Sequence, residues 1–303
     1  MAPLVPRFHL FEIDDQAWFP QTLREKVQSC LTLFWTFRLP LLQTSSPAAQ
    51  VTSVLLHTLS HSIRQYTFVD YCAGAGGPTP TIERLLNSEL TSTASSSSSS
   101  TAGMRNGDAP ASDGDEPVKF LLTDICPHVE AWEALAKKSD NLGYVAEPVD
   151  AAAPGARMLG KEGRKKKEFR LFSLAFHHFD DALAGEILRS TLEGSDGFGI
   201  FELQDRTFSS LLTVTLLGPL LLLLTPFFFW RSPTHLLFTY LLPIVPFVIV
   251  FDGYVSSLRT RTTEEVLQLA SGNGRIKGWK IRSGRELHTW PLSYMHWIVG
   301  VRE

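Results

Sequence analysis

Short apolar runs alternate with segments of helical periodicity through the middle of the chain. Five of these runs predict strands: 67–71, 118–123, 144–149, 169–176 and 197–203. Apolar side chains at three- and four-residue steps separate them, which is typical of helices. The alternation predicts an α/β fold with a Rossmann-like, mostly parallel sheet that is covered by helices on both faces.

The predicted core covers 66–205 and is completed by residues 252–303. Two runs in the second part, 278–282 and 294–301, bring the sheet to seven strands. Because a short Gly/Arg-containing turn joins these two runs, they can form an antiparallel edge.

Residues 1–65 predict an N-terminal helical cap. Apolar side chains recur at helical spacing from Gln21 until Pro40, and again over 48–64. Two interpretations are open for these helices, because they could cover a substrate pocket or only pack on the sheet.

A nearly uncharged hydrophobic block occupies 206–251. No Asp, Glu, Lys or Arg lies between Arg206 and Arg231, or between Arg231 and Asp252. About 20 apolar residues span a bilayer. The block therefore predicts an inserted helical hairpin that spans or enters a membrane, with prolines that allow kinked or re-entrant helices. The alternative is a hairpin buried inside a soluble protein.

Two polar segments interrupt the core. Residues 89–117 are rich in serine and poor in apolar side chains, which predicts a disordered insertion. A basic run within 157–170 is typical of a solvated loop, with contact to anionic lipid as the alternative.

Overall charge and cysteine content narrow the function classes. The formal net charge of −3 gives no electrostatic reason to expect a nucleic-acid partner. The three cysteines are widely separated and lack metal or disulfide spacing. This pattern predicts a reducing compartment, with the catalytic domain facing the cytoplasm. The organelle and the oligomeric state stay open.

The candidate chemistry begins with VDYCAGAGG, in which the first predicted strand ends in a glycine turn. Such a strand, turn and helix start can hold a nucleotide-type ligand. Gly74 and Gly76 match the first two glycines of a dinucleotide fingerprint, but Thr79 occupies the third position. That departure disfavours a nucleotide-dependent oxidoreductase.

Acidic residues end three successive predicted strands. These residues are Asp70, Asp124 and Asp150. Open parallel sheets bind ligands at the carboxyl ends of their strands. A carboxylate at Asp124 could accept from both ribose hydroxyls, and Asp150 could accept from an adenine amine. Asp70 could bind a cationic group or hold the turn.

These motifs resemble those of the class I S-adenosylmethionine-dependent methyltransferases. The resemblance implies S-adenosyl-L-methionine as the cofactor. It places Asp70, Ala73, Gly74 and Gly76 at the methionine end of that cofactor. It also places Asp124 with Ile125 at the ribose, and Asp150 with Ala151 near the adenine. Cys72 departs from the pattern, because the family often has a glycine there.

His177 and His178 follow the fourth predicted strand, where the family's acceptor-facing residues lie. Either histidine could remove a proton from the acceptor during methyl transfer. The alternative is that the pair only lines the pocket or caps the next helix together with Asp180. The sequence indicates no metal site, because its nine histidines are scattered.

Together these patterns predict a membrane-anchored methyltransferase whose acceptor is a small molecule, lipophilic or lipid in nature. The rival is a catalytically inactive, membrane-associated scaffold that keeps the methyltransferase fold. Binding of the methyl donor or its demethylated product distinguishes the two.

Overall fold

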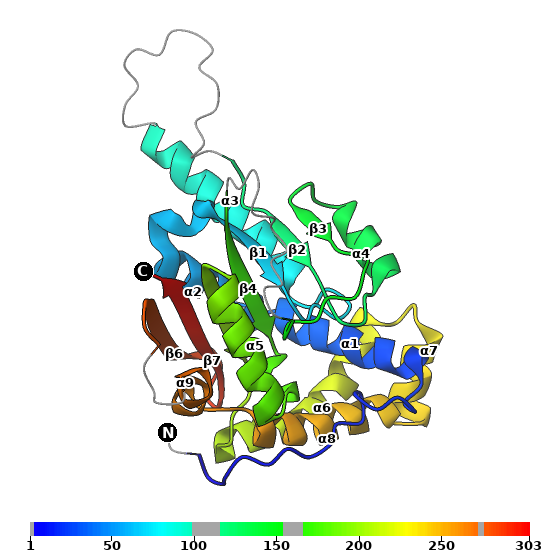
Figure 1. Ribbon diagram of the computed structural model, residues 1–303. Helices are drawn as coiled ribbons and strands as arrows, with labels where there is room; N and C mark the ends of the chain where they lie inside the picture. Colours follow the sequence, from blue (N-terminus) through cyan, green and yellow to red (C-terminus); the bar gives the residue numbers. More distant parts are fainter. Residues whose placement is uncertain (1–2, 99–115, 154–165, 272–275) are drawn as a thin grey trace.

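The computed structural model describes residues 3–98, 116–153, 166–271 and 276–303 (Figure 1). Within these residues, seven strands form one sheet in the order β3-β2-β1-β4-β5-β7-β6. The strands are β1 (Tyr66–Asp70), β2 (Phe120–Leu122), β3 (Leu142–Tyr144), β4 (Lys167–Ser173), β5 (Gly197–Glu202), β6 (Trp279–Thr289) and β7 (Ser293–Arg302).

The sheet is mixed rather than mostly parallel, which corrects the sequence prediction. Strands β1 to β5 pair only in parallel with one another. Strand β7 is antiparallel to both of its neighbours, β5 and β6. The physical reason is the short turn between β6 and β7, since a tight hairpin can join only antiparallel strands. In the sheet, β7 lies between β5 and β6, and β6 is the edge strand.

Helices cover both faces of the sheet. Helices α2 (Pro47–Leu59), α3 (Thr79–Ser98) and α4 (Val129–Ala136) contribute to a buried cluster with Phe68, Phe120 and Phe169. Helices α5 (Asp181–Gly194) and α9 (Thr263–Ser271) contribute to a second cluster around Phe172 and Phe198. A 3-10 turn, η1 (Ser60–Gln65), connects α2 to β1.

Helix α3 continues into the segment predicted to be disordered. It ends at Ser98, whereas the prediction placed the start of the insertion at residue 89. Residues 99–115, the rest of that insertion up to Glu116, lie outside the described residues, as does most of the basic run, 154–165.

The hydrophobic block forms a bent pair of helical segments. Helix α6 (Phe208–Phe228) is followed by α7 (Pro233–Leu236), the π turn η4 (Leu237–Leu241) and α8 (Ile244–Arg259). Among the described residues, α6 is the one helix long and apolar enough to cross a membrane by itself, and the second segment bends by 71° between η4 and α8. Helix α8 continues beyond residue 251, where the sequence predicted the hairpin to end.

The hairpin is packed against the N-terminal part of the chain (Figure 1). Helix α1 (Gln21–Thr36) shares a buried cluster with α6 and α8 that includes Val27, Leu221 and Val248. The buried Asp252 on α8 accepts hydrogen bonds from the backbone N–H groups of Ile13 and Asp14, at 2.7 and 2.9 Å. These contacts fix the segment before α1 against α8. Helix α2, in contrast, packs on the sheet.

Candidate functional site

Asp70, the last residue of β1, stabilises the glycine turn that follows through two hydrogen bonds. Its carboxylate accepts from the Thr79 hydroxyl at 2.5 Å and from the Cys72 N–H at 3.4 Å. Burial raises the pKa of Asp70 to about 7. Gly74 and Gly76 have φ values of +49° and +109°, a region that favours glycine. Asp70 therefore acts on the turn itself, which is one of the two roles predicted for it.

Asp124 connects the second strand to the same turn. One carboxylate oxygen accepts from the Gly74 N–H at 2.9 Å, and the other accepts from the Cys126 N–H at 2.9 Å. Ile125, next to it, is exposed. The Trp132 indole donates to the Gly74 carbonyl at 2.8 Å. The loops after β1 and β2 are thus joined through side chains at the carboxyl edge of the sheet.

A cleft of about 330 Å³ lies where the strand order reverses between β1 and β4, and we call it the switch-point cleft. Open α/β sheets bind ligands at such a position. Five of the eight predicted cofactor residues line it: Asp70, Ala73, Gly74, Asp124 and Ile125.

The other three predicted cofactor residues lie outside that lining. A side chain at Gly76 would meet Leu135 at 2.5 Å, so this glycine serves close packing. Asp150 is exposed, while Ala151 is buried in the cluster on the α5 face. Their loop still adjoins the cleft, because the Val149 N–H donates to the Asp124 carbonyl at 2.9 Å.

His177 lies in the 3-10 turn η3 (Phe176–His178), directly after β4, and is buried. Its Nδ1 lies 2.8 Å from a Glu202 carboxylate oxygen at the end of β5. The other Glu202 oxygen accepts from the His177 backbone N–H at 3.1 Å. Glu202 therefore fixes both the ring and the backbone of His177 and turns the ring Nε2 away from β5.

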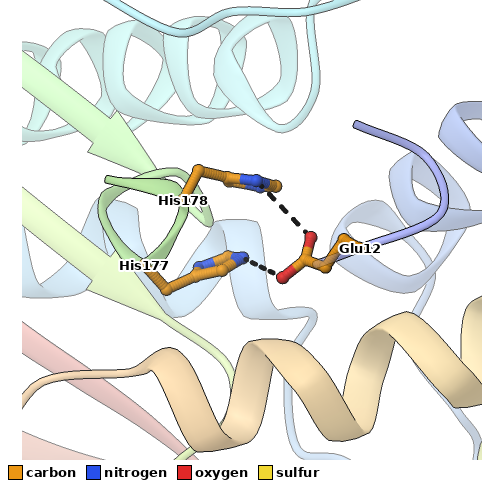
Figure 2. Close-up of side chains that lie close together, drawn as sticks. All are labelled: Glu12, His177 and His178. Carbon is orange, nitrogen blue, oxygen red and sulfur yellow. Dashed lines mark ion pairs between the residues drawn. The ribbon is translucent and has the colours of Figure 1, made fainter. Parts of the chain in front are cut away.

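His178 faces the N-terminal segment. Its Nδ1 lies 3.1 Å from an Asp15 oxygen and 3.4 Å from a Glu12 oxygen. Burial opposes charge on this imidazole, but the Asp15 hydrogen bond and the Glu12 carboxylate outweigh it and raise the pKa of His178 to about 9. Figure 2 shows both rings directed toward Glu12, with His177 Nε2 at 3.7 Å from a Glu12 oxygen.

A second cavity, of about 340 Å³, lies between α1, α6, α8 and the turn joining β6 to β7, and we call it the apolar cavity. Most of its wall is apolar, with side chains that include Val27, Phe34, Val214, Leu217, Leu220 and Ile249. Its polar end carries Glu12, His177, His178 and Gln204.

The apolar cavity adjoins the switch-point cleft. Asp14, Leu31, Trp35, Leu174 and His178 line both. The exposed side chains Leu42, Leu216 and Trp290 also line the apolar cavity, so it reaches the protein surface beside them. The arrangement can hold one polar ligand and one apolar ligand that meet near His178.

Exposed apolar side chains gather on the hairpin, and we call this surface the apolar face. Its members are Leu216, Leu222, Leu223, Phe227, Phe228, Trp230, Leu237, Tyr240, Leu241, Leu242 and Phe247. The opposite side of α6 is buried through Val214, Gly218, Leu221 and Thr225. Each side of the hairpin therefore has a different environment, one inside the protein and one outside.

Sequence reasoning missed several residues of the polar end. Glu202 ends β5 and could have been found by the rule that singled out Asp70 and Asp124, since it too ends a strand. Glu12 and Asp15 carry no local signal, because only the packing of the N-terminal segment against α8 brings them to the histidines.

No protein-family model and no curated protein matches the sequence. Among solved structures, the chain is similar to the pyocyanin biosynthetic protein PhzM, at 15% identity and a TM-score of 0.41, over 84% of this chain and 56% of PhzM. It is also similar to the methyltransferase domain of bacterial CtHen1-C, at 9% identity and a TM-score of 0.42, over 84% of this chain and 96% of that domain. The DszA carbon methyltransferase matches at 11% identity and a TM-score of 0.42, over 84% of this chain and 53% of DszA. The chain thus spans about half the length of PhzM and DszA, and similarity this remote leaves the function to be argued from the site.

Proposed function

We propose that the protein is an S-adenosylmethionine-dependent methyltransferase, anchored to a membrane, that methylates a lipophilic small molecule or a lipid. One observation carries the proposal: the switch-point cleft and the apolar cavity adjoin each other along Leu174 and His178. Methyl transfer needs a donor and an acceptor held end to end, because the reaction depends mainly on positioning.

The donor would occupy the switch-point cleft. Two kinds of observation support this assignment. The residues of the glycine turn resemble the cofactor motif of class I methyltransferases, and Asp124 holds that turn from the neighbouring strand. Its carboxylate lies at the cleft wall, where it could accept from the ribose hydroxyls. Asp150 and Ala151 keep their proposed place near the adenine, at the edge of the cleft.

The acceptor would occupy the apolar cavity, with its reacting end toward His177 and His178 and its apolar part toward Leu216 and Trp290. The apolar wall favours a lipophilic chain or ring system, because burial of apolar surface is worth about 25 cal/mol per Å². The two histidines keep their proposed place beside the reacting atom. They face the polar end of the cavity together with Glu12.

The apolar face would bury itself in one side of a membrane, with the catalytic domain in the cytoplasm. Contiguous exposed apolar surface is typical of membrane or partner contacts. The second half of α8 is bound to the N-terminal segment through Asp252, so the hairpin lies alongside the domain. Because the mouth of the apolar cavity includes Leu216, a member of the apolar face, an acceptor could enter directly from the lipid.

Calorimetric titration with S-adenosylmethionine, and with its demethylated product, tests the donor assignment and separates the enzyme from an inactive scaffold. We expect both ligands to bind. Failure of both to bind would contradict the proposed function. Incubation with methyl-labelled donor and vesicles of total lipid extract should then place label in the organic phase, which tests transfer of the methyl group to a lipophilic acceptor.

Replacing Leu220 with tryptophan should block the acceptor. Leu220 lines the apolar cavity, and a larger ring there would take the place of part of the acceptor. We expect kcat/KM for the labelled lipid acceptor to fall at least about tenfold, since displaced apolar groups are each worth about 1.5–3 kcal/mol. Donor affinity should stay unchanged in the same titration.

Leu222→Trp is the matched control, because Leu222 is two positions away on α6 and points to the exposed side. Equal loss of activity in both variants, or none in Leu220→Trp, would contradict the placement of the acceptor.

A further inference from the structure

Three side chains with metal-binding atoms meet at the polar end of the apolar cavity (Figure 2). We propose that Glu12, His177 and His178 bind one divalent metal ion of the Zn²⁺ class, whose remaining coordination position faces the apolar cavity. The three ligand atoms lie within 4.8 Å of one another. Glu12 comes from the N-terminal segment and the histidines come from η3. The site therefore has no metal-binding spacing in the sequence that would predict it.

The donor set and the spacing both suit zinc. Two histidines and one glutamate, with a fourth position left open, are a known ligand set of catalytic zinc sites. Ligands about 2.0–2.1 Å from a tetrahedral ion lie about 3.3 Å apart. His178 Nδ1 lies 3.4 Å from one Glu12 oxygen, and His177 Nε2 lies 3.7 Å from the other. One ligand atom from each residue lies within 4.8 Å of the others, so the widest separation would have to shorten by at most about 1.5 Å on metal binding.

The residue that contacts the far side of the His177 ring suits a metal site. Histidine ligands generally donate their second ring N–H to a carboxylate, which fixes the ring and the tautomer. Glu202 lies 2.8 Å from His177 Nδ1 and can accept that proton, which leaves Nε2 as a free ligand directed at Glu12. The pair of Glu202 and His177 therefore has the form of a carboxylate–histidine–metal triad.

Glu12 is oriented in a similar way. One of its oxygens accepts from the Ser256 hydroxyl at 3.0 Å and lies 3.1 Å from the Arg259 guanidinium. The other oxygen faces His178. Arg259 also pairs with Asp15 at 3.1 Å. Glu12, Asp15 and Glu202 thus place three carboxyl groups around the two histidines, and Arg259 contacts two of these groups.

The open position gives the ion a role in the proposed reaction, and this step rests on the proposed function. All three ligands line the apolar cavity, so an oxygen atom at the polar end of the acceptor could complete the coordination. A bound metal ion holds and polarises such an oxygen. The acceptor class is thereby narrowed to lipophilic molecules with a hydroxyl, phenol or carboxylate group at one end.

Zinc binding to the full-length protein tests the site without reference to methyl transfer. After treatment with a chelator and dialysis, titration with Zn²⁺ alone should give one bound ion per chain with a Kd below about 1 µM. Co²⁺ in place of Zn²⁺ should produce the visible absorption of a four-coordinate site.

Variants locate the ion. Glu12→Gln and His178→Asn should each weaken Zn²⁺ binding by more than about 100-fold. Glu202→Gln should weaken it by about 10- to 100-fold, because the carboxylate that orients the His177 ring is lost. His57→Asn, at an exposed position on α2, is the control and should bind as the wild type does. Thermal unfolding reports whether each variant is folded, and His178→Asn alters a partly exposed side chain.

The proposal is overturned if the wild type binds Zn²⁺ more weakly than about 100 µM. It is also overturned if folded Glu12→Gln and His178→Asn bind Zn²⁺ as tightly as the wild type. Because this readout does not involve the methyl donor, loss of zinc binding leaves the donor titration unaffected, and failure of the donor titration leaves the zinc result standing.

Discussion

Replacing Asp124 with alanine is expected to lower the affinity for S-adenosylmethionine by at least about a hundredfold. Two effects act together. The carboxylate would lose its hydrogen bonds to the ribose, and hydrogen bonds to a charged group are worth about 1.5–3 kcal/mol each. The variant also releases the N–H groups of Gly74 and Cys126, both held at 2.9 Å, which loosens the glycine turn. Loss of two such hydrogen bonds alone lowers the affinity for the donor about a hundredfold.

Calorimetric titration with the methyl donor measures this loss, and two further variants separate its causes. Asp124→Asn keeps one acceptor oxygen without the charge and should bind with intermediate affinity. Asp140→Ala removes an exposed carboxylate just before β3, at the amino ends of the parallel strands and so away from the cleft at their carboxyl ends. This variant should bind the donor as the wild type does. If folded Asp124→Ala binds the donor with unchanged affinity, the switch-point cleft is not the donor site.

Except for β3, which ends at Tyr144 where the sequence placed the start of a strand over 144–149, the strands and the residues of the switch-point cleft were predictable because their determinants are local. An apolar run of strand length ends in an acid and a glycine turn, and parallel strands bring such ends to one edge of the sheet. Asp70, Gly74 and Asp124 therefore lie together along the switch-point cleft, where the Thr79 hydroxyl also donates to Asp70.

The polar end of the apolar cavity was not predictable in the same way, because long-range packing creates it. Glu12 lies beside His177 and His178 because the N-terminal segment packs against α8, where Asp252 accepts from the Ile13 N–H. The composition of the hairpin gives its apolar character but not its packing, so its continuation to Arg259 could not be read from the hydrophobic block. The antiparallel position of β7 likewise depends on which partner the β6–β7 hairpin meets.

The hairpin links the two halves of the proposed function. Its buried side closes the apolar cavity through Val214, Leu217 and Ile249. Its other side forms the apolar face. A soluble enzyme would need only the first of these surfaces, since exposed apolar side chains in such number are costly in water. An anchor alone would need only the second. The presence of both on one hairpin favours an acceptor that comes from the membrane.

Replacing Phe227 and Leu241 together with glutamate should therefore release the protein from membranes. Their side chains are 72% and 74% exposed, so the substitutions remove almost no internal packing. Each apolar side chain buried in lipid contributes at least about 1.5 kcal/mol. Loss of both lowers the partition coefficient at least about a hundredfold, and the new charges lower it further. Flotation with vesicles of total lipid extract measures the bound fraction.

The control must add negative charge outside the apolar face. Leu183→Glu serves this purpose, because Leu183 is an exposed apolar residue on α5, outside the hairpin. It should float with vesicles as the wild type does, and the donor affinity of both variants should equal that of the wild type. Release of Leu183→Glu to the same extent would point to a general effect of charge. Flotation of the double variant at the wild-type level would show that the apolar face does not enter the membrane, and the acceptor would then have to reach the cavity from water.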